Sequence, residues 1–300
     1  MPCKGCGKSK APLAPPPPLL LKNAQGKPVD LGGFYAGRAV FLMLGGPSLT
    51  TNRLELLRTP GIVTMGVNNM WSVYRPNLWC CVDPPGHFID TGWKDASVIK
   101  FVPQGCEKTK LHIKKKDGTF GLSTFTTNQM PGVLYFPRNS RFDHEKYLTE
   151  PTINWGNNGK AKDSLGIKGS RSVMLAAVKL AYYLGFKNVY LLGCDFNMKQ
   201  RPGKVTPGNY AFKQGRTVSS VKGNNRSYRV LNQRFGALKL SFHKAGFNVF
   251  NCNPNSGLKV FPTVKFPEAI AKASAEAVKI VNTEGWYSHG KIKGPDKKKK

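Results

Sequence analysis

The chain has 300 residues, 46 of them Lys or Arg and only 16 Asp or Glu, so its formal net charge at pH 7 is +30. The hydrophobic fraction of 40% is enough for a sizeable core, while the charge far exceeds what solubility requires. Such a charge favours a polyanionic partner, such as nucleic acid, nucleotide phosphates or an anionic surface.

The positive charge is not confined to the two ends of the chain. Residues 1–36 hold five Lys and one Asp, and residues 285–300 hold six Lys and one Asp. These segments account for +4 and +5 of the +30, which leaves +21 for the remaining residues. We therefore expect the folded part of the chain to bind a polyanion as well.

The sequence predicts a protein without a membrane span, in a reducing compartment. No apolar run is long enough to cross a bilayer, and no N-terminal segment resembles a signal peptide. The seven Cys are an odd number, and Cys80 and Cys81 are adjacent, which disfavours a disulfide framework. We expect a cytoplasmic location, which is the host cytoplasm if the protein is viral.

Residues 1–36 are predicted to be a flexible, basic and Pro-rich tail. Cys3 and Cys6 form one Cys-x-x-Cys pair, which is half of a zinc site, and no second pair with matching spacing follows. A mobile tail is therefore favoured over a zinc site. Residues 285–300 form a second, Lys-rich tail, so residues 37–284 are expected to be a single domain.

Short apolar segments alternate with helical ones along residues 37–284. The predicted strands are 39–44, 62–67, 78–82, 98–102, 133–136, 189–192 and 248–252. The predicted helices are 51–58, 170–184, 230–245 and 267–281, with a basic insertion or hairpin at 105–131. Strands that alternate with helices favour an α/β fold with a Rossmann-like, doubly wound, mostly parallel sheet.

Polar or Gly-rich residues follow several predicted strands. The first strand leads into Gly45–Ser48, a turn that lets backbone N–H groups approach a phosphate, although it lacks the full dinucleotide and P-loop patterns. Asn68 and Asn69 follow the second strand, Asp83 the third, and Asp195 the strand at 189–192. Ligands of open α/β sheets bind beyond the carboxyl ends of the strands, so these residues are site candidates. A plain turn and a capping role for Asp195 are the alternatives.

Two further segments frame the strand at 189–192. The helix before this strand is expected to begin at an N-cap Ser170 and to end at Gly185. Residues 197–229, which follow it, hold eight Lys or Arg, no acidic residue and several Gly. This composition predicts a basic lid that closes over phosphates, with a solvated disordered loop as the alternative.

Four motifs, taken together and in order, resemble those of a known superfamily. They are Leu44–Leu49, Val67–Asn69, Tyr190–Phe196 and Phe250–Ser256. Their order and spacing are similar to those of bacterial lipooligosaccharide sialyltransferases, motility-accessory glycosyltransferases and archaeal 6-hydroxymethylpterin diphosphokinase. The set is more specific for the Rossmann-like fold than for the reaction.

This resemblance implies a nucleotide site at the strand ends. In the family, the Gly-rich loop holds the nucleotide phosphate or sugar, an asparagine contacts the nucleotide and donor, and a later stretch holds the cytidine. The residues that match these positions, or adjoin them, are Gly45, Gly46, Pro47, Ser48, Asn68, Asn69, Cys194, Asp195, Phe196, Asn255 and Ser256.

The sequence departs from the family at three positions. Gly45 stands where the family has an asparagine, and Asn197 stands where the sialyltransferases have a tyrosine that touches phosphate. The stretch Ser227–Arg229 lacks the histidine base that the sialyltransferases carry there. The nucleotide site is therefore better supported than the catalytic base.

The resemblance and the residues predict a glycosyltransferase that uses a nucleotide-sugar donor and requires no metal ion. The candidate catalytic residues are Asp195, Asp83 and Arg229, with His87 as a further candidate base. A carboxylate would take the proton of the acceptor, and an arginine would stabilise the leaving nucleoside phosphate. The net charge suggests a nucleic-acid acceptor, such as a modified base in viral DNA.

Two alternatives remain open. One is a non-catalytic nucleic-acid-binding protein on the same fold, for which Lys114–Lys116 and residues 197–229 are the expected contact surfaces. The other is a diphosphokinase that transfers pyrophosphate from ATP, with Asp83 and Asp195 holding Mg²⁺.

Overall fold

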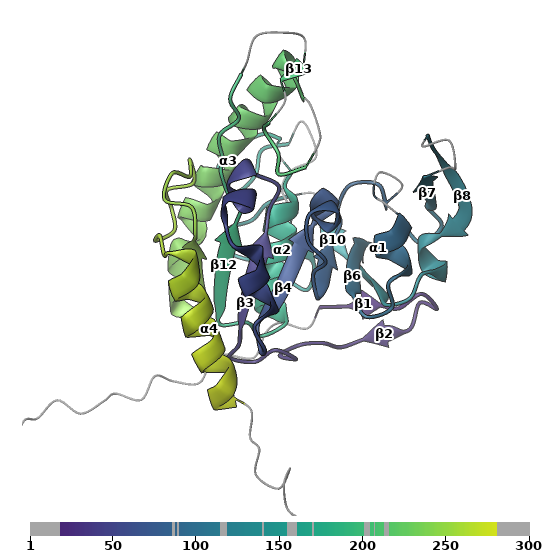
Figure 1. The fold of residues 1–300 in the computed structure, drawn as a ribbon, viewed down its shortest axis with the longest axis horizontal. Coiled ribbons are helices and arrows are strands. Elements are labelled where there is room, and N and C mark those ends of the chain that lie inside the picture. Colours follow the sequence, from purple (N-terminus) through teal and green to yellow (C-terminus); the bar gives the residue numbers. More distant parts are fainter. Residues whose placement is uncertain are drawn as a thin grey trace, which may run out of the picture.

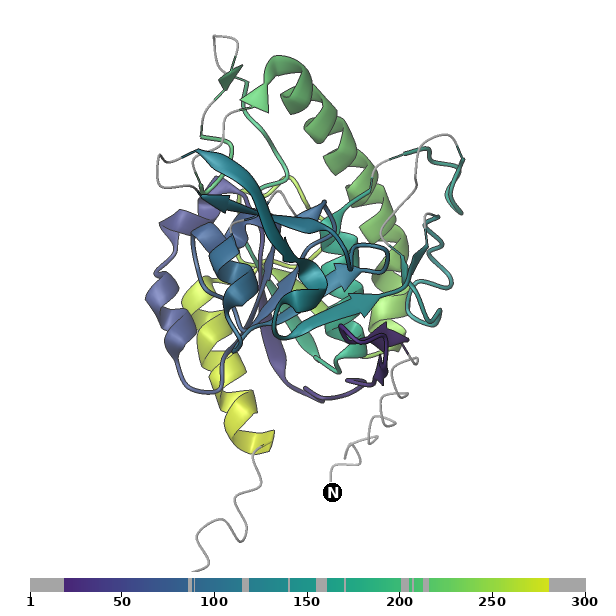
Figure 2. The same ribbon diagram turned by 90° about the vertical axis from the view of Figure 1, so that its right-hand side faces the viewer.

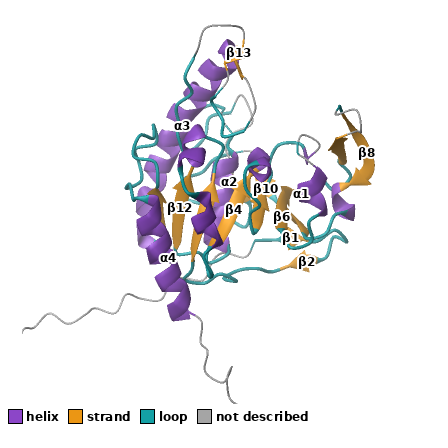
Figure 3. Ribbon diagram, viewed as in Figure 1, coloured by secondary structure: helices purple, strands orange, loops and turns teal. Residues whose placement is uncertain are grey.

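The computed structural model describes residues 19–280, apart from 86–87, 89, 115–118, 140, 155–160, 170, 201–204, 207 and 213–215. These residues form a mixed α/β structure around a large, mostly parallel central sheet, compatible with a Rossmann-like α/β fold (Figures 1 and 3). No helix in this part of the chain is long and apolar enough to cross a membrane. Residues 1–18 and the predicted C-terminal tail lie outside the described residues.

The central sheet contains nine strands of the described residues. In spatial order they are β15 (Asn248–Asn251), β12 (Asn188–Leu192), β3 (Ala39–Met43), β4 (Val63–Val67), β5 (Leu78–Cys80), β6 (Ile99–Pro103), β9 (Val133–Phe136), β1 (Leu21–Lys22) and β2 (Pro28–Val29). The seven strands predicted from apolar runs are all confirmed. Such runs are typical of strands whose two faces are both covered.

The order in which the chain fills the sheet reverses at β3. From β3 the chain adds β4, β5, β6 and β9 in parallel on one side. It then returns to place β12 and β15 in parallel on the other side of β3. The connections after β3 and β12 therefore lead in opposite directions, which is the arrangement that opens a crevice at the carboxyl ends of two adjacent strands.

Helices cover both faces of the sheet. α2 (Val173–Tyr183) and α3 (Val218–Lys244) lie on one face, and α4 (Phe266–Ile280) lies on the other (Figure 2). α2 packs against β4 and β5, whereas α4 packs against β3. The short α1 (Asp90–Lys94) connects β5 with β6.

An aromatic row joins three neighbouring strands. Tyr190 of β12 stacks on Phe41 of β3 with a centroid distance of 5.1 Å, and on Phe250 of β15 at 5.3 Å. Phe266 at the start of α4 meets Phe41 edge-on at 5.9 Å. Cross-strand aromatic pairs of this kind stabilise the pairing register.

The folded part of the chain begins before residue 37, so the predicted boundary at residue 36 is wrong. Lys22 of β1 pairs with Tyr135 of β9, and β2 pairs with β1 in turn. Leu19 and Leu21 are buried in the core. This two-residue strand cannot be recognised from the charged and Pro-rich sequence around it, because its burial depends on partners more than a hundred residues away.

The basic segment after β6 forms the expected hairpin. β7 (Lys110–Lys114) and β8 (Phe120–Thr126) pair in an antiparallel sheet separate from the central one (Figure 1). Three further pairs of short strands or strand segments were not predicted. Two of them are β10 (Arg138–Asn139) with β11 (Ile153–Asn154), and β13 (Val205–Thr206) with β14 (Arg216–Thr217); the third is β1 with β2.

Two predicted helix boundaries require correction. The helix expected at 51–58 is instead a pair of 3₁₀ helices, Pro47–Thr51 and Leu54–Arg58. The N-cap of α2 is Ser172, whose side chain accepts a hydrogen bond from Met174 N, while Ser170 lies outside the described residues. Gly185 follows the end of α2 with φ +87°, as expected for a left-handed residue after a helix.

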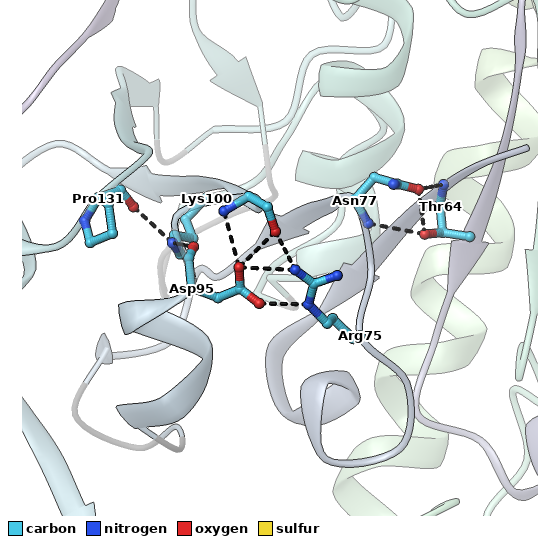
Figure 4. Close-up of polar contacts among 7 residues, drawn as sticks. Thr64, Arg75, Asn77, Asp95, Lys100 and Pro131 are labelled. Carbon is cyan, nitrogen blue, oxygen red and sulfur yellow. Dashed lines mark hydrogen bonds and ion pairs between the residues drawn. The ribbon is translucent and has the colours of Figure 1, made fainter. Parts of the chain in front are cut away.

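The amino ends of β4, β5 and β6 are held by a polar cluster (Figure 4). Arg75 donates to both carboxylate oxygens of Asp95, and the buried Lys100 donates to Pro131 O at 2.7 Å and to Asp95 O. The hydrogen bonds from Arg75 hold the pKa of Asp95 well below its usual range, and burial lowers the pKa of Lys100 to about 8. In the same view Asn77 Oδ1 accepts from Thr64 N and Oγ1. These polar groups, at the amino end of the sheet, are therefore hydrogen-bonded to other protein groups.

α3 is a 27-residue helix that begins at Val218, so the lid predicted at 197–229 is wrong for its last twelve residues. Thr217 caps the helix by accepting from Ser220 N. Gly223 and Gly236 both lie inside the helix, and a Cβ added at either would have no heavy atom within 4 Å. A glycine in a helix interior costs about 1 kcal/mol relative to alanine, so neither glycine is explained by packing.

We predict that Gly236→Ala raises the free energy of unfolding by about 0.5–1 kcal/mol, because the new methyl group meets open space and removes backbone entropy from the unfolded chain. Urea denaturation measures this change. Gly185→Ala is the control: its φ is +87° and its Cβ would lie 2.8 Å from Gly33 Cα, so it is expected to destabilise. A Gly236→Ala protein that is less stable than wild type contradicts the prediction.

Candidate functional site

A cavity of about 430 Å³ lies at the carboxyl ends of β3 and β12, where the chain order reverses. Its walls come from the segments after β3, β4, β5 and β12, from the N-terminus of α2, from residues 209–212 and from α3. The volume is within the range of small-molecule and nucleotide sites. The structure thus brings residues from four strand ends to one cavity.

The segments after β3 and β12 are joined backbone to backbone. Leu44 N donates to Leu192 O, and Gly46 N donates to Gly193 O, both at 2.8 Å. A Cβ on Gly46 would lie 2.0 Å from the Asp195 carboxylate, and one on Gly193 would lie 2.3 Å from Leu44 O. Both positions therefore require glycine for this close approach.

The Asp195 carboxylate fastens three segments together. Its Oδ2 accepts from Ser48 N at 3.2 Å and from Ser48 Oγ at 2.8 Å, and its Oδ1 accepts from Asn253 Nδ2 at 3.2 Å. Its backbone oxygen also accepts from Gly257 N at 2.7 Å. Asp195 lines the cavity, yet both of its carboxylate oxygens already have protein donors, which makes it a positioning residue.

The predicted phosphate loop offers few free amides. The N–H groups of Gly46 and Ser48 donate to Gly193 and Asp195. Pro47 has no N–H, and Gly45 N has no acceptor among the described residues. The loop is closed on itself, so its residues shape the cavity more than they offer donors to an anion.

Asn68 and Asp83 form a polar wall of the cavity. Asn68 Nδ2 donates to Asp83 Oδ2 at 3.0 Å, and Asn68 O accepts from Trp79 Nε1 at 2.8 Å. Asn68 Oδ1 is buried without a donor among the described residues. Asp83 is exposed, and its Oδ1 accepts no hydrogen bond from them. An acceptor left without a donor next to a cavity suits a ligand hydroxyl or amino group.

Left-handed backbone conformations also concentrate at the cavity. Asn68 has φ +47° and Phe196 has φ +52°, and they are the non-glycine residues with positive φ in the described part of the chain. Both line the cavity. Asn adopts a left-handed backbone readily, whereas for Phe it is costly, and such strained residues tend to occur at functional sites.

Aromatic rings form the remaining walls. Phe196 stacks on Tyr228 of α3 with a centroid distance of 4.8 Å, and Tyr210 stacks on Phe212 at 5.0 Å. No Lys or Arg of the described residues lines the cavity. The positive end that faces it is the N-terminus of α2, at Ser172.

The predicted site residues fall into two groups. Those that line the cavity are Gly45, Gly46, Asn68, Asn69, Asp83, Cys194, Asp195 and Phe196. Those that do not line it are Pro47, Ser48, Arg229, Asn255 and Ser256. Ser48 acts through Asp195, and buried Ser256 donates weakly to Asp195 O at 3.5 Å. Asn255 and Arg229 are exposed to solvent.

The cavity also includes residues that the sequence did not suggest. Phe88, Ser172, Met174, Asn209 and Leu231 all line it. Ser172 was within reach of the sequence, since it stands beside the predicted N-cap at the start of an apolar helix. Phe88 and Asn209 stand in loops without a pattern that marks them.

The described residues contain no group of three or more His, Cys, Asp or Glu placed to hold a metal ion. Cys3, Cys6 and His87 lie outside the described residues. Burial raises the pKa of the Cys194 thiol well above its usual value, so this cavity residue is a neutral thiol at physiological pH.

In comparisons with protein-family models, curated proteins and solved structures, nothing matched this chain.

We predict that Asp195→Ala lowers the free energy of unfolding by about 2 kcal/mol, since it removes the charged acceptor of Ser48 and Asn253. Asp83→Ala is the matched control, because the exposed Asp83 accepts one side-chain hydrogen bond within the described part of the chain, from Asn68. Its expected loss is smaller, about 1 kcal/mol or less. Chemical denaturation of both variants checks the difference, and equal losses would contradict the anchoring role.

Proposed function

We propose that this protein is a glycosyltransferase that uses a nucleotide-sugar donor, bound in the cavity at the carboxyl ends of β3 and β12. The observation that carries the proposal is the polar wall of Asn68 and Asp83, which lines the same cavity of about 430 Å³ as the stacked aromatic rings. The doubly wound chain order around β3 and the resemblance to sialyltransferases and related transferases support it.

The walls suit the nucleoside and sugar of such a donor. A nucleobase is planar and apolar on its faces, so it can stack beside Phe196 and Tyr228. Sugar hydroxyls and base amino groups are hydrogen-bond donors, and Asn68 Oδ1 is a buried acceptor without a donor among the described residues. Asn69 lies next to Asn68 and lines the same wall.

The phosphates of the donor have a different expected position. Ser172, Val173 and Met174 bring the N-terminus of α2 to the cavity, and the partial positive charge of a helix N-terminus favours an anion. Gly45 N adds one amide without an acceptor among the described residues. This arrangement supports phosphate binding between α2 and the end of β3.

Asp83 is the proposed general base of the transfer. Its Oδ2 accepts from Asn68, whereas its Oδ1 accepts no hydrogen bond from the residues that the structure describes and is the oxygen proposed to take a proton from the acceptor hydroxyl. Attack of that oxygen on the anomeric carbon breaks the bond to the leaving nucleotide phosphate, and the carboxylate retains the proton. Asp195 then contributes by holding the loops in place, and Arg229 has no role inside the cavity.

The first test is nucleotide binding. CMP, UDP, GDP and ATP are screened by thermal shift with and without Mg²⁺, and at least one is expected to raise the unfolding midpoint without the ion. Tyr228→Ala should weaken the binding of that nucleotide roughly 5- to 150-fold, the value of one stacked base.

Tyr228→Phe is the matched control for this test, because it keeps the stacked ring and loses only the hydroxyl. It should bind the nucleotide nearly as wild type does. If Tyr228→Ala also binds the nucleotide as tightly as wild type does, the nucleoside does not stack on Phe196 and Tyr228.

The second test concerns the base. Asp83→Asn should lower the rate of donor turnover by about 10²- to 10⁴-fold, because an amide cannot take the proton. Release of nucleotide from the donor, with water as acceptor, measures that rate. Nucleotide affinity should stay unchanged, since Asn can still accept from Asn68 Nδ2.

Glu145→Gln, an exposed carboxylate on the surface, is the control for the loss of one negative charge. A full rate in Asp83→Asn would exclude Asp83 as the base. Turnover that EDTA abolishes and Mg²⁺ restores would instead favour the diphosphokinase alternative.

A further inference from the structure

α3 carries a row of exposed cations along one face. The exposed Lys and Arg of this helix are Lys222, Arg226, Arg229, Lys239 and Lys244. Lys222, Arg226 and Arg229 follow one another at four- and three-residue steps, which places them on the same side of the helix. These three cations span about 10.5 Å at 1.5 Å per residue, Lys244 lies on the same side about 22 Å beyond Arg229, and Lys239 points about 80° away from Arg229. α3 contains no acidic residue.

The fold does not explain these cations. The opposite side of α3 is buried through Leu231, Phe235, Leu238 and Phe242. None of the five exposed cations forms an ion pair with a carboxylate of the described residues. By contrast, the buried Arg234 of the same helix is paired with Asp163 at 2.8 Å.

Two glycines leave parts of the exposed side of α3 without a side chain. Gly223 lies three residues before Arg226 and Gly236 seven residues after Arg229, spacings that place each glycine next to one of these cations, and both are exposed. Nothing lies within 4 Å of a Cβ added at either residue. A glycine that no protein neighbour requires is expected where an outside chain approaches the backbone closely.

The cation row lies beside the cavity. Tyr228 and Leu231 of α3 line the cavity, while Arg226 and Arg229 of the same turns face solvent. A linear polyanion bound along the exposed face of α3 would therefore pass within about one helical turn, 5.4 Å along the axis, of the Phe196–Tyr228 stack.

We propose that the exposed face of α3 binds the sugar–phosphate backbone of a single nucleic-acid strand and that one unpaired base of this strand reaches the cavity. Lys222, Arg226 and Arg229 lie about 6 and 4.5 Å apart along the helix axis, which suits contacts to successive phosphates. The Tyr210–Phe212 stack also lines the cavity and is not used by the donor nucleobase, so it can receive an unpaired base. Strand binding on α3 stands independently, whereas the base as acceptor rests on the proposed function. The exposed Arg229 then contacts phosphate outside the cavity.

The test uses the full chain and a labelled single-stranded oligothymidylate, with an RNA strand, a DNA duplex and anionic phospholipid vesicles as further probes. The variant Lys222→Ala/Arg226→Ala/Arg229→Ala removes three cations of the row. Lys27→Ala/Lys187→Ala/Lys272→Ala removes three exposed lysines elsewhere and is the matched control. Fluorescence anisotropy over a range of salt concentrations gives the affinity and its salt dependence.

The α3 variant is expected to bind the strand about tenfold or more weakly, with a slope of log K against log salt that is smaller by about 2. The control should keep both values near those of wild type. Gly223→Leu leaves the charge unchanged but adds a side chain that keeps the nucleic acid away from the helix backbone, so it should also weaken binding of the single strand. Thermal shift with the nucleotide should be unchanged in the α3 variant.

Equal losses in the α3 variant and the control would overturn the proposal, as would tighter binding to duplex or to vesicles than to the single strand. A wild-type protein that binds no nucleotide but binds the strand through α3 would sink the proposed function and leave strand binding on α3 in place. If the DNA and RNA single strands bind with different affinities, the tighter one identifies the type of nucleic acid that α3 binds.

Discussion

The structure depends on the close contact between the segments that follow β3 and β12. Gly46 and Gly193 approach so closely that a side chain on either would collide with an oxygen within 2.5 Å. Asp195 closes this contact by accepting from Ser48 and from Asn253. Because the chain leaves these two strands in opposite directions, the same contact brings the polar wall, the aromatic rings and the start of α2 around one cavity.

The strands of the sheet were predictable, while the long helix and the N-terminal strand were not. A strand buried on both faces is a short continuous apolar run, as in Asn188–Leu192, and this local signal needs no tertiary context. The first half of α3 has Gly223, Asn224 and Asn225, which individually disfavour a helix. Within the helix, Asn225 Oδ1 accepts from Met198 N and its Nδ2 donates to Met198 O, and this partner 27 residues away is not visible in the local sequence.

The candidate site was predictable in its location and only partly in its roles. A polar residue at the end of a parallel strand marks the ligand edge, and Asn68, Asp83 and Asp195 do reach one cavity. The sequence does not show which carboxylate is already bonded, since that depends on Ser48 and Asn253, which are distant along the chain from Asp195. The Phe196–Tyr228 stack was hidden for the same reason.

The two halves of α3 differ in local stability. Its C-terminal half is held in the core by Leu231, Phe235, Leu238 and Phe242, whereas the N-terminal half buries Val221 and rises beyond the sheet (Figure 1). Segments with few buried contacts open locally at a free energy far below that of global unfolding. The first turns of α3 can therefore exchange their amide hydrogens and uncover the Tyr228 side of the cavity while the sheet and its aromatic row stay intact.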